Sequence, residues 1–336
     1  MKRIGILLTV LMFFTAGNVP VGYALASHHL GMAAGKSQCR AITKTVTGKK
    51  TRVKICIRKK PTPVPFSLPT GVAVDARGNV YVTDSGHDRI VKLSPGGSVL
   101  AKWGTSGSGS GQFNVPNMLA LDAKGNVYVA DSNNNRIQKL SPTGKPLAQW
   151  GAEGSGPGQL SEPKGVAADS QGNVYVADTF NNRIEKLSTA GAPLAEWAVG
   201  LGLRHPSGIA VDSRGEVIVA DSGNQRVLKL SPSGASLDQW GVDAGLNKPN
   251  GVAVDAKDNI YVVDRASSRV QKLSPSGALL ARWGTHGSGS GQFSLASNGR
   301  LNGIAVGSHG NVFVADTANN RIQKLSPRGK VLSIWR

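Results

Sequence analysis

Six aspartate–arginine pairs recur along the sequence, each with its arginine five residues after its aspartate. A carboxylate and a guanidinium at this spacing can form a short, charge-assisted hydrogen bond that closes a loop or ties two segments together. A catalytic group needs one special environment, whereas this pair is repeated. We therefore expect a structural role for all of them. The pairs are Asp84 and Arg89, Asp131 and Arg136, Asp178 and Arg183, Asp221 and Arg226, Asp264 and Arg269, and Asp316 and Arg321.

A second aspartate stands ahead of the pair in five copies, before turns of the Gly-Asn type. Carboxylates at such positions cap turns by accepting hydrogen bonds from the backbone. They are also hard oxygen ligands, so a calcium site is the alternative. These residues are Asp75, Asp122, Asp169, Asp212 and Asp255, with Gly307 in the last copy.

A repeated unit has to position these side chains, because the paired aspartates are spaced 47, 47, 43, 43 and 52 residues apart. A near-fixed period of this length indicates a solenoid or a propeller. The second copy contains apolar runs at 119–121, 127–129, 137–140 and 146–150, separated by residues that favour turns. Helical periodicity is not sustained. Four strands per copy, arranged radially, leave only short protected edges, so we predict an all-β, six-bladed β-propeller of four-stranded blades over residues 69–336.

The copies are similar to the NHL repeat family through the segments GVAVD, NVYVAD, NRIQKLSP and GQF. This resemblance covers residues 69–335 and implies a six-bladed propeller. It does not imply one activity, because the family is mostly binding platforms with a few lyases. The last copy contains its own fourth strand, so we expect the ring to close by packing of whole blades. The blades are expected near 69–115, 116–162, 163–205, 206–248, 249–297 and 298–336.

All six tryptophans end the fourth strand of a copy, which favours packing between blades over a sugar-binding platform. They are Trp103, Trp150, Trp197, Trp240, Trp283 and Trp335. The Gly-rich stretches 107–111, 154–158 and 287–291 lack the dinucleotide-binding spacing and a following helix. We expect no phosphate-binding role for them.

Residues that vary between copies are the better guide to a site on the propeller's loops. A polar set just before the first strands is expected to surround the channel mouth, where it either binds a small ligand or is hydrated. This set is Thr70, Asn117, Lys164, Ser207, Asn250 and Asn302. Further out, the variable residues include His87, Asp88, Asn133, Asn134, Phe180, Gln225 and Arg265.

The propeller lyases that the family resembles hold a divalent metal with histidines. Here only His87, His205 and His286 are expected to share the loop face, so a zinc site made by these three is the metal alternative. No G-x-S-x-G segment or Ser-His-acid arrangement appears. We expect no catalytic residue and no cofactor, with calcium or zinc as the alternative.

The N-terminus carries Lys2 and Arg3, an apolar run over 4–14 and Ala24-Leu25-Ala26, which is typical of a secretory signal. An uncleaved anchor is the alternative, but the run is shorter than the roughly 20 residues needed to span a bilayer. We expect residues 1–26 to be a signal peptide. The mature chain is then secreted, extracellular or periplasmic, without a membrane span, and a monomer.

Residues 27–60 form a basic arm with ten Lys or Arg and no acid, in a chain of net charge +19. Such an arm attracts polyanions, and an exported protein meets cell-surface polymers first. The arm has no aromatic residue on which a single-stranded base could stack, so specific nucleic-acid binding is not expected. The partner is an unknown protein or a polyanionic cell-surface polymer, and a merely solvated arm is the alternative.

Cys39 and Cys56 are the only cysteines. Alternation around Thr47-Gly48 predicts a hairpin in which they stand opposite each other, and an exported chain meets oxidising conditions, so we expect a disulfide. The spacing suits neither a redox pair nor a metal site. The Pro-rich segment 61–68 is predicted to be a stiff linker.

Together these features predict an exported binding or scaffolding module that presents a propeller face to a protein, a polysaccharide or another ligand. The alternative is a metal-dependent lyase or hydrolase that acts on a small molecule at the channel mouth. Structural decoration of a cell surface is a third class.

Overall fold

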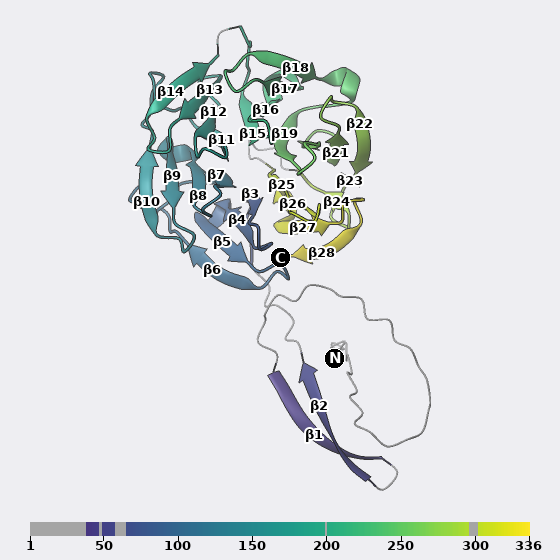
Figure 1. Ribbon diagram of the computed structural model, residues 1–336. Helices are drawn as coiled ribbons and strands as arrows, with labels where there is room; N and C mark the ends of the chain where they lie inside the picture. Colours follow the sequence, from purple (N-terminus) through teal and green to yellow (C-terminus); the bar gives the residue numbers. More distant parts are fainter. Residues whose placement is uncertain (1–37, 47–48, 58–64, 199, 296–301) are drawn as a thin grey trace. The chain divides into compact units, whose positions relative to one another are not determined.

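The computed structural model describes residues 38–46, 49–57, 65–198, 200–295 and 302–336, with the first two ranges as backbone alone (Figure 1). The chain divides into two compact units, Met1–Thr62 and Pro63–Arg336. The predicted signal peptide, 1–26, lies outside the described residues.

The first unit contains an antiparallel hairpin of β1 (Gln38–Val46) and β2 (Lys49–Ile57). Its register places Cys39 opposite Cys56, as the alternation predicts. The cysteine side chains lie outside what the structure describes, so the disulfide stays a prediction.

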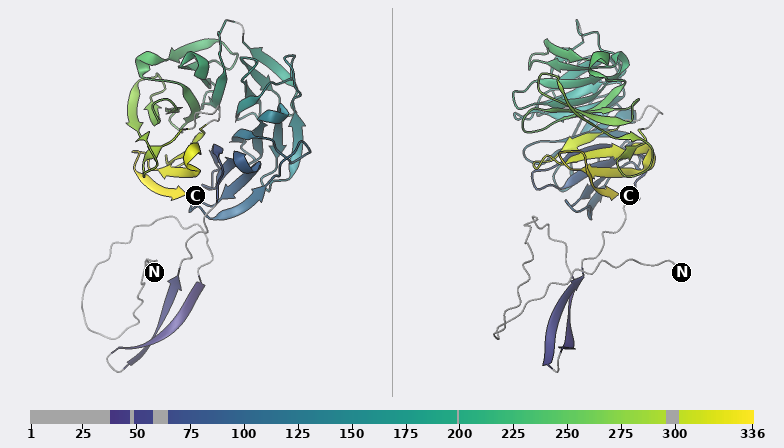
Figure 2. Two further views of the ribbon diagram at one scale, coloured as in Figure 1. Left: turned by 180° about the vertical axis from the view of Figure 1, so that it is seen from behind. Right: turned by 90° about the vertical axis from the view of Figure 1, so that its right-hand side faces the viewer.

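The second unit is the predicted six-bladed propeller (Figures 1 and 2). Each blade is an antiparallel sheet whose four strands follow one another in chain order. Blade six is built only from residues 304–335 and lies beside blade one, so the ring closes without a shared blade, as expected. The blades are β3 (Pro69–Val74), β4 (Val80–Asp84), β5 (Arg89–Leu93) and β6 (Val99–Trp103); β7 (Pro116–Leu121), β8 (Val127–Asp131), β9 (Arg136–Leu140) and β10 (Pro146–Trp150); β11 (Pro163–Ala168), β12 (Val174–Asp178), β13 (Arg183–Leu187) and β14 (Pro193–Trp197); β15 (Pro206–Val211), β16 (Val217–Asp221), β17 (Arg226–Leu230) and β18 (Ser236–Trp240); β19 (Pro249–Val254), β20 (Ile260–Asp264), β21 (Arg269–Leu273) and β22 (Leu279–Trp283); and β25 (Ile304–Val306), β26 (Val312–Asp316), β27 (Arg321–Leu325) and β28 (Val331–Trp335).

Helical structure in the described residues is limited to five 3-10 turns of three residues each. Four of them, η1 (Ser85–His87), η2 (Ser132–Asn134), η3 (Ser222–Asn224) and η5 (Thr317–Asn319), follow the second strand of a blade. The fifth, η4 (Val242–Ala244), joins blades four and five. A short parallel pair, β23 (Thr285–His286) and β24 (Gln292–Phe293), lies between blades five and six.

The apolar core lies between the blades. Every residue of each second strand is buried, in keeping with its β-branched and aromatic composition. Six apolar clusters form, one for each pair of neighbouring blades, and the cluster between blades six and one includes Val80 and Phe313.

The tryptophans pack between blades, as predicted. Trp103 lies against Gly144 in the last hairpin turn of blade two, and Trp335 lies against Gly97 of blade one in the same way. Gly144 has φ +87°, and a Cβ there would come within 2.3 Å of the indole ring. The turn therefore requires glycine at position 144, because the backbone there is left-handed and the Trp103 ring leaves no space for a Cβ atom.

The end of the predicted linker belongs to the propeller. Phe66 is buried in the cluster between blades six and one, and Ser67 N donates to Asp84 Oδ1 at 2.6 Å. Residues 66–68 therefore pack on the propeller at the junction of blades six and one, and the role of the preceding linker residues stays a prediction.

Candidate functional site

The aspartate–arginine pairs form in five of the six blades, with nitrogen–oxygen distances of 2.5–2.8 Å and fully buried carboxylates. Blade five is the exception among the described residues. There Asp264 accepts a hydrogen bond from Ser267 Oγ and a longer one, 3.4 Å, from Gln271, while Arg269 Nε reaches only Ser267 O at 3.5 Å. The expected pair of Asp264 and Arg269 is therefore absent, because a neighbouring hydroxyl occupies the carboxylate.

The Gly-rich stretches have a structural partner in these arginines. Arg136 donates to the carbonyl oxygens of Ser108, Gly109 and Gln112 at 2.6–3.0 Å. Blades three and six repeat the arrangement with Arg183 and Arg321. The carbonyl oxygens of these loops thus bind the guanidinium groups of the protein's own arginines.

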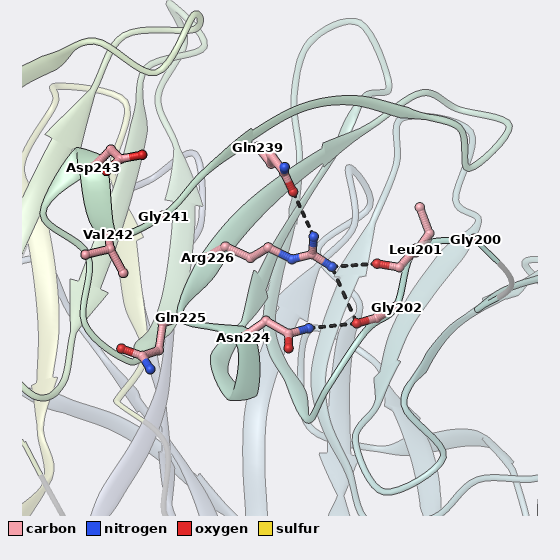
Figure 3. Close-up of a pocket in the computed structure, with 10 residues that line it drawn as sticks. All are labelled: Gly200, Leu201, Gly202, Asn224, Gln225, Arg226, Gln239, Gly241, Val242 and Asp243. Carbon is pink, nitrogen blue, oxygen red and sulfur yellow. Dashed lines mark hydrogen bonds between the residues drawn. The ribbon is translucent and has the colours of Figure 1, made fainter.

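The loop before blade four is shorter, and it leaves an open pocket of about 580 Å³ beside Arg226 (Figure 3). Arg226 donates to Leu201 O, to Gly202 O and to Gln239 Oε1. This pocket lies beside the outer strands and contains one positively charged side chain, Arg226, opposite Asp243.

The second aspartates cap the turns between first and second strands. Asp122 Oδ1 accepts from the backbone nitrogens of Lys124 and Asn126 at 2.9 and 2.8 Å, and Asp75, Asp169, Asp212 and Asp255 make the equivalent bonds. The turn-capping prediction is confirmed, because each of these carboxylates accepts hydrogen bonds from the backbone of its own turn.

The polar set at the first strands mainly joins neighbouring blades. Thr70, Asn117, Ser207, Asn250 and Asn302 are at most 4% exposed. Asn117 Nδ2, for example, donates to Ser132 Oγ at 2.6 Å, and Ser132 Oγ donates to Pro163 O of the next blade at 2.5 Å. The hydroxyl after each second strand makes this latch in five blades, through Ser85, Ser132, Thr179, Ser222 and Thr317. That any of the set also contacts a ligand stays a prediction.

In four blades a second latch holds the residue just before the first strand. This residue has a left-handed backbone in five blades, with φ between +42° and +63°. In blade four His205 N donates to Asn182 Oδ1 of blade three at 2.8 Å, and Leu68, Val115 and Glu162 make the equivalent bond. The backbone is fixed while the side chain type varies, so these positions can carry specific groups on a rigid frame.

On blades three to five, the varying positions converge on one pocket of about 260 Å³, here named the cationic pocket. Its lining residues are Lys164, Thr179, His205, Ser207, Ser222, Gly223, Lys248, Asn250 and Arg265. Arg265 stands where the other five blades have Ser or Thr, and Lys164 stands where they have Thr, Asn or Ser. The repeat's architecture does not require these cations.

Electrostatics in the cationic pocket favour an anion. None of its lining residues is acidic. Burial lowers the pKa of Lys164, Glu162 raises it and the positive charge of Arg265 lowers it further, so an anion would relieve the remaining unfavourable charge. The rim carries Phe180, 49% exposed, whose ring lies 5.5 Å from Lys164 Nζ and 5.8 Å from the His205 ring.

A family model matches residues 34–273 and is described as the virginiamycin B lyase family. The chain belongs to the virginiamycin B lyase family. Residues 299–325 match the NHL repeat, which confirms the predicted resemblance.

Solved structures share the fold of this family member. A streptogramin B lyase is 15% identical with a TM-score of 0.59, covering 83% of this chain and 86% of its own. A catalytically inactive histidine-to-alanine variant of the Staphylococcus aureus virginiamycin B lyase with quinupristin is 16% identical, with a TM-score of 0.57 and coverage of 89% and 88%. A gluconolactonase from Xanthomonas campestris is 16% identical, with a TM-score of 0.55 and coverage of 75% and 84%. A comparison with curated proteins found no match.

The described part of this family member offers no donor set for a metal ion, since no three His, Cys, Asp or Glu side chains gather suitably there. His87 Nδ1 lies 2.9 Å from Asp84, His205 packs on Phe180, and His286 lies 3.4 Å from Ser268 Oγ. The three histidines of the zinc alternative thus have separate environments on three blades. We therefore derive no chemistry through a metal. No helix in the described ranges is long and apolar enough to cross a membrane.

The sequence pointed to Lys164, Phe180 and Arg265 as variable positions but not to the pocket that joins them. His205 entered only as a metal ligand, and Lys248 was missed. Aligning the copies position by position would have shown that Arg265 replaces the Ser or Thr of the other copies. No sequence signal indicates that Lys248 lines the same pocket as Arg265.

Proposed function

We propose that this propeller is a binding module that takes an anionic ligand in the cationic pocket. One observation carries the proposal: Lys164, Lys248, Arg265 and His205 line a single pocket without an acid, on three consecutive blades of a repeat that does not need them. Positive groups on a rigid, concave surface attract and orient anions.

The basic arm extends this proposal to the cell surface. We propose that the chain is exported and that its arm, with ten Lys or Arg over 27–60, raises the local concentration of a polyanionic polymer. The arm attracts polyanions through its charge without a defined binding geometry, whereas the cationic pocket selects among anionic ligands. The arm's contribution should weaken as salt rises, because exposed charges are screened over about 8 Å at physiological ionic strength.

The test uses the mature chain and variants that borrow residues from other blades. Lys164→Asn copies the residue at 117, and Arg265→Ser copies the residue at 222, so both should fold. The matched control is Lys124→Gln, an exposed cation in the turn at the opposite end of the strands. Every variant keeps the arm, so a difference between them reports on the pocket.

Binding is measured by titration calorimetry with galacturonate oligomers, a glycerol phosphate oligomer and neutral galactose oligomers. We expect binding of one or both anions, a loss of about tenfold or more in each pocket variant, and native affinity for Lys124→Gln. Equal binding of neutral and anionic oligomers, or native affinity in both pocket variants, would refute the proposal.

A lyase or hydrolase is the second candidate, and it is favoured only by the family match over residues 34–273. Incubation of the mature chain with a streptogramin B antibiotic, followed by liquid chromatography and tandem mass spectrometry with and without added divalent cations, tests it. A product that differs from the antibiotic in retention time or fragmentation would establish this activity, and an unchanged antibiotic would leave the binding module as the better proposal.

A further inference from the structure

The strongest asymmetry in the ring is a missing hydroxyl next to Asn250. In blades two and six, the equivalent asparagines donate through Nδ2 to the hydroxyl after the second strand: Asn117 to Ser132 at 2.6 Å and Asn302 to Thr317 at 2.7 Å. In blade five the asparagine is retained, but Arg265 replaces the hydroxyl.

Asn250 therefore lacks the contact that Asn117 and Asn302 make through Nδ2. Its Oδ1 accepts from Asn302 N at 2.8 Å, which fixes the side chain. Its Nδ2 donates no hydrogen bond to any described residue, although Asn250 is only 4% exposed and lines the cationic pocket. Nδ2 is not among the fully buried side-chain atoms that lack a partner, so this N–H group is accessible and can donate to a ligand acceptor in the pocket.

We propose that Asn250 Nδ2 and the Arg265 guanidinium together bind the carboxylate of a single uronic acid unit; this rests on the proposed anion-binding function. Both groups line the same pocket, and Arg265 makes no side-chain hydrogen bond within the described chain. A guanidinium presents two parallel N–H donors that match the two oxygens of a carboxylate. The amide adds a neutral donor from a fixed side chain.

The rest of the pocket selects the body of the ligand. Phe180 replaces the Gly, Asn or Ala of the other blades, and its exposed ring borders Lys164 and His205. An aromatic face can cover the flat face of a sugar ring. The remaining side chains around it are rich in hydrogen-bond donors, which suits a ring bearing several hydroxyl oxygens better than an apolar ring.

Pocket size limits the ligand to a small unit. The volume of about 260 Å³ lies below the roughly 300–1,000 Å³ of pockets for drug-sized ligands. The cationic pocket is therefore suited to one sugar acid, free or at the end of an acidic polysaccharide.

The Arg265→Ser exchange tests the pair directly, because serine restores the hydroxyl that Asn250 lacks. We expect it to reduce galacturonate affinity at least tenfold and to leave the melting temperature equal or higher. Asn250→Asp keeps the acceptor for Asn302 N but removes the donor, and it should also abolish binding. Lys124→Gln is the control with native affinity, and thermal melts of all variants show that each is folded.

Ligand controls separate the parts of the proposal. Galactose has the same ring without the carboxylate, and benzoate has the carboxylate without the hydroxyls; we expect both to bind at least tenfold more weakly than galacturonate. Native affinity for galacturonate in Arg265→Ser would overturn the assigned pair. If glycerol phosphate binds and depends on Lys164 while galacturonate does not bind, the uronate assignment fails and anion binding stands. If no anion binds, both fail.

Discussion

Replacing one arginine of the repeat should destabilise the propeller in blade six but hardly in blade five. Arg321 is fully buried and donates to Asp316 Oδ2 at 2.5 Å and to three loop carbonyls, those of Ser288, Gly289 and Gln292, at 2.7–2.8 Å. Arg321→Met keeps an unbranched side chain of similar reach but removes all these donors.

The size of the effect follows from what remains unpaired. Breaking a buried ion pair from one side is unfavourable by about 3–5 kcal/mol. Asp316 retains donors from Ser294 N, Asn319 and Gln323 at 2.8–3.0 Å, which favours the lower end, about 3 kcal/mol. In blade five, Arg269 has no such pair, so Arg269→Met should change stability by less than about 1 kcal/mol.

Urea unfolding followed by tryptophan fluorescence measures both variants against the native protein. A difference of 3 kcal/mol corresponds to roughly 6–12 °C in melting temperature at about 2–4 °C per kcal/mol. Equal destabilisation by the two exchanges would refute the reasoning, because it would mean that the repeat position sets the effect and the observed contacts do not.

Three further predictions concern other parts of the chain. Gly144→Ala should destabilise the propeller by roughly 1–3 kcal/mol in urea unfolding, because its Cβ would meet Trp103 and its backbone is left-handed; an unchanged midpoint would contradict the tryptophan packing. Burial raises the pKa of the Asp264 carboxyl group above the value of about 3.9 that it has in the unfolded chain. Between these two pKa values the native state keeps the carboxyl proton and the unfolded state has released it, so the free energy of unfolding should fall as pH rises through this range. Asp264→Asn should flatten this part of the melting temperature–pH curve, and an identical slope in both proteins would be inconsistent with it. Cys39 and Cys56 should resist alkylation until reduced, as read by mass spectrometry, and two free thiols in protein from an oxidising compartment would exclude the disulfide.

Much of the fold was predictable because it is local and repeated. Turn-capping by Asp122 depends on residues two and four positions away, and the alternation of each strand fixes which side chains are buried. The role of Trp103 was predictable for the same reason, since a large ring at every fourth strand must meet the next blade.

Other features depend on contacts between distant residues. Ser132 bonds to Pro163, which is 31 residues away in the sequence. Because such contacts are not visible in the sequence, the polar set was interpreted as lining a channel mouth, although most of its side chains are buried. The latch formed by Ser132 does not follow from residue types, because it requires the relative placement of two blades. The missing Asp264 pair is a local effect, because Ser267 and Arg269 of the same blade compete for one carboxylate and residue types alone do not decide between them.

Blade six meets blade one through contacts that recur at other junctions, including Trp335 on Gly97 and the bond of 2.7 Å from Leu68 N to Asn320 Oδ1. None of the described strands crosses this junction, which joins the first and the last blade of the propeller sequence. If the segments that enter β3 and leave β28 were pulled apart, the load would fall on these side-chain contacts before any sheet was strained. We expect blades six and one to separate first, with all six sheets still intact. The blades at the two ends of the opened array should then unfold one at a time.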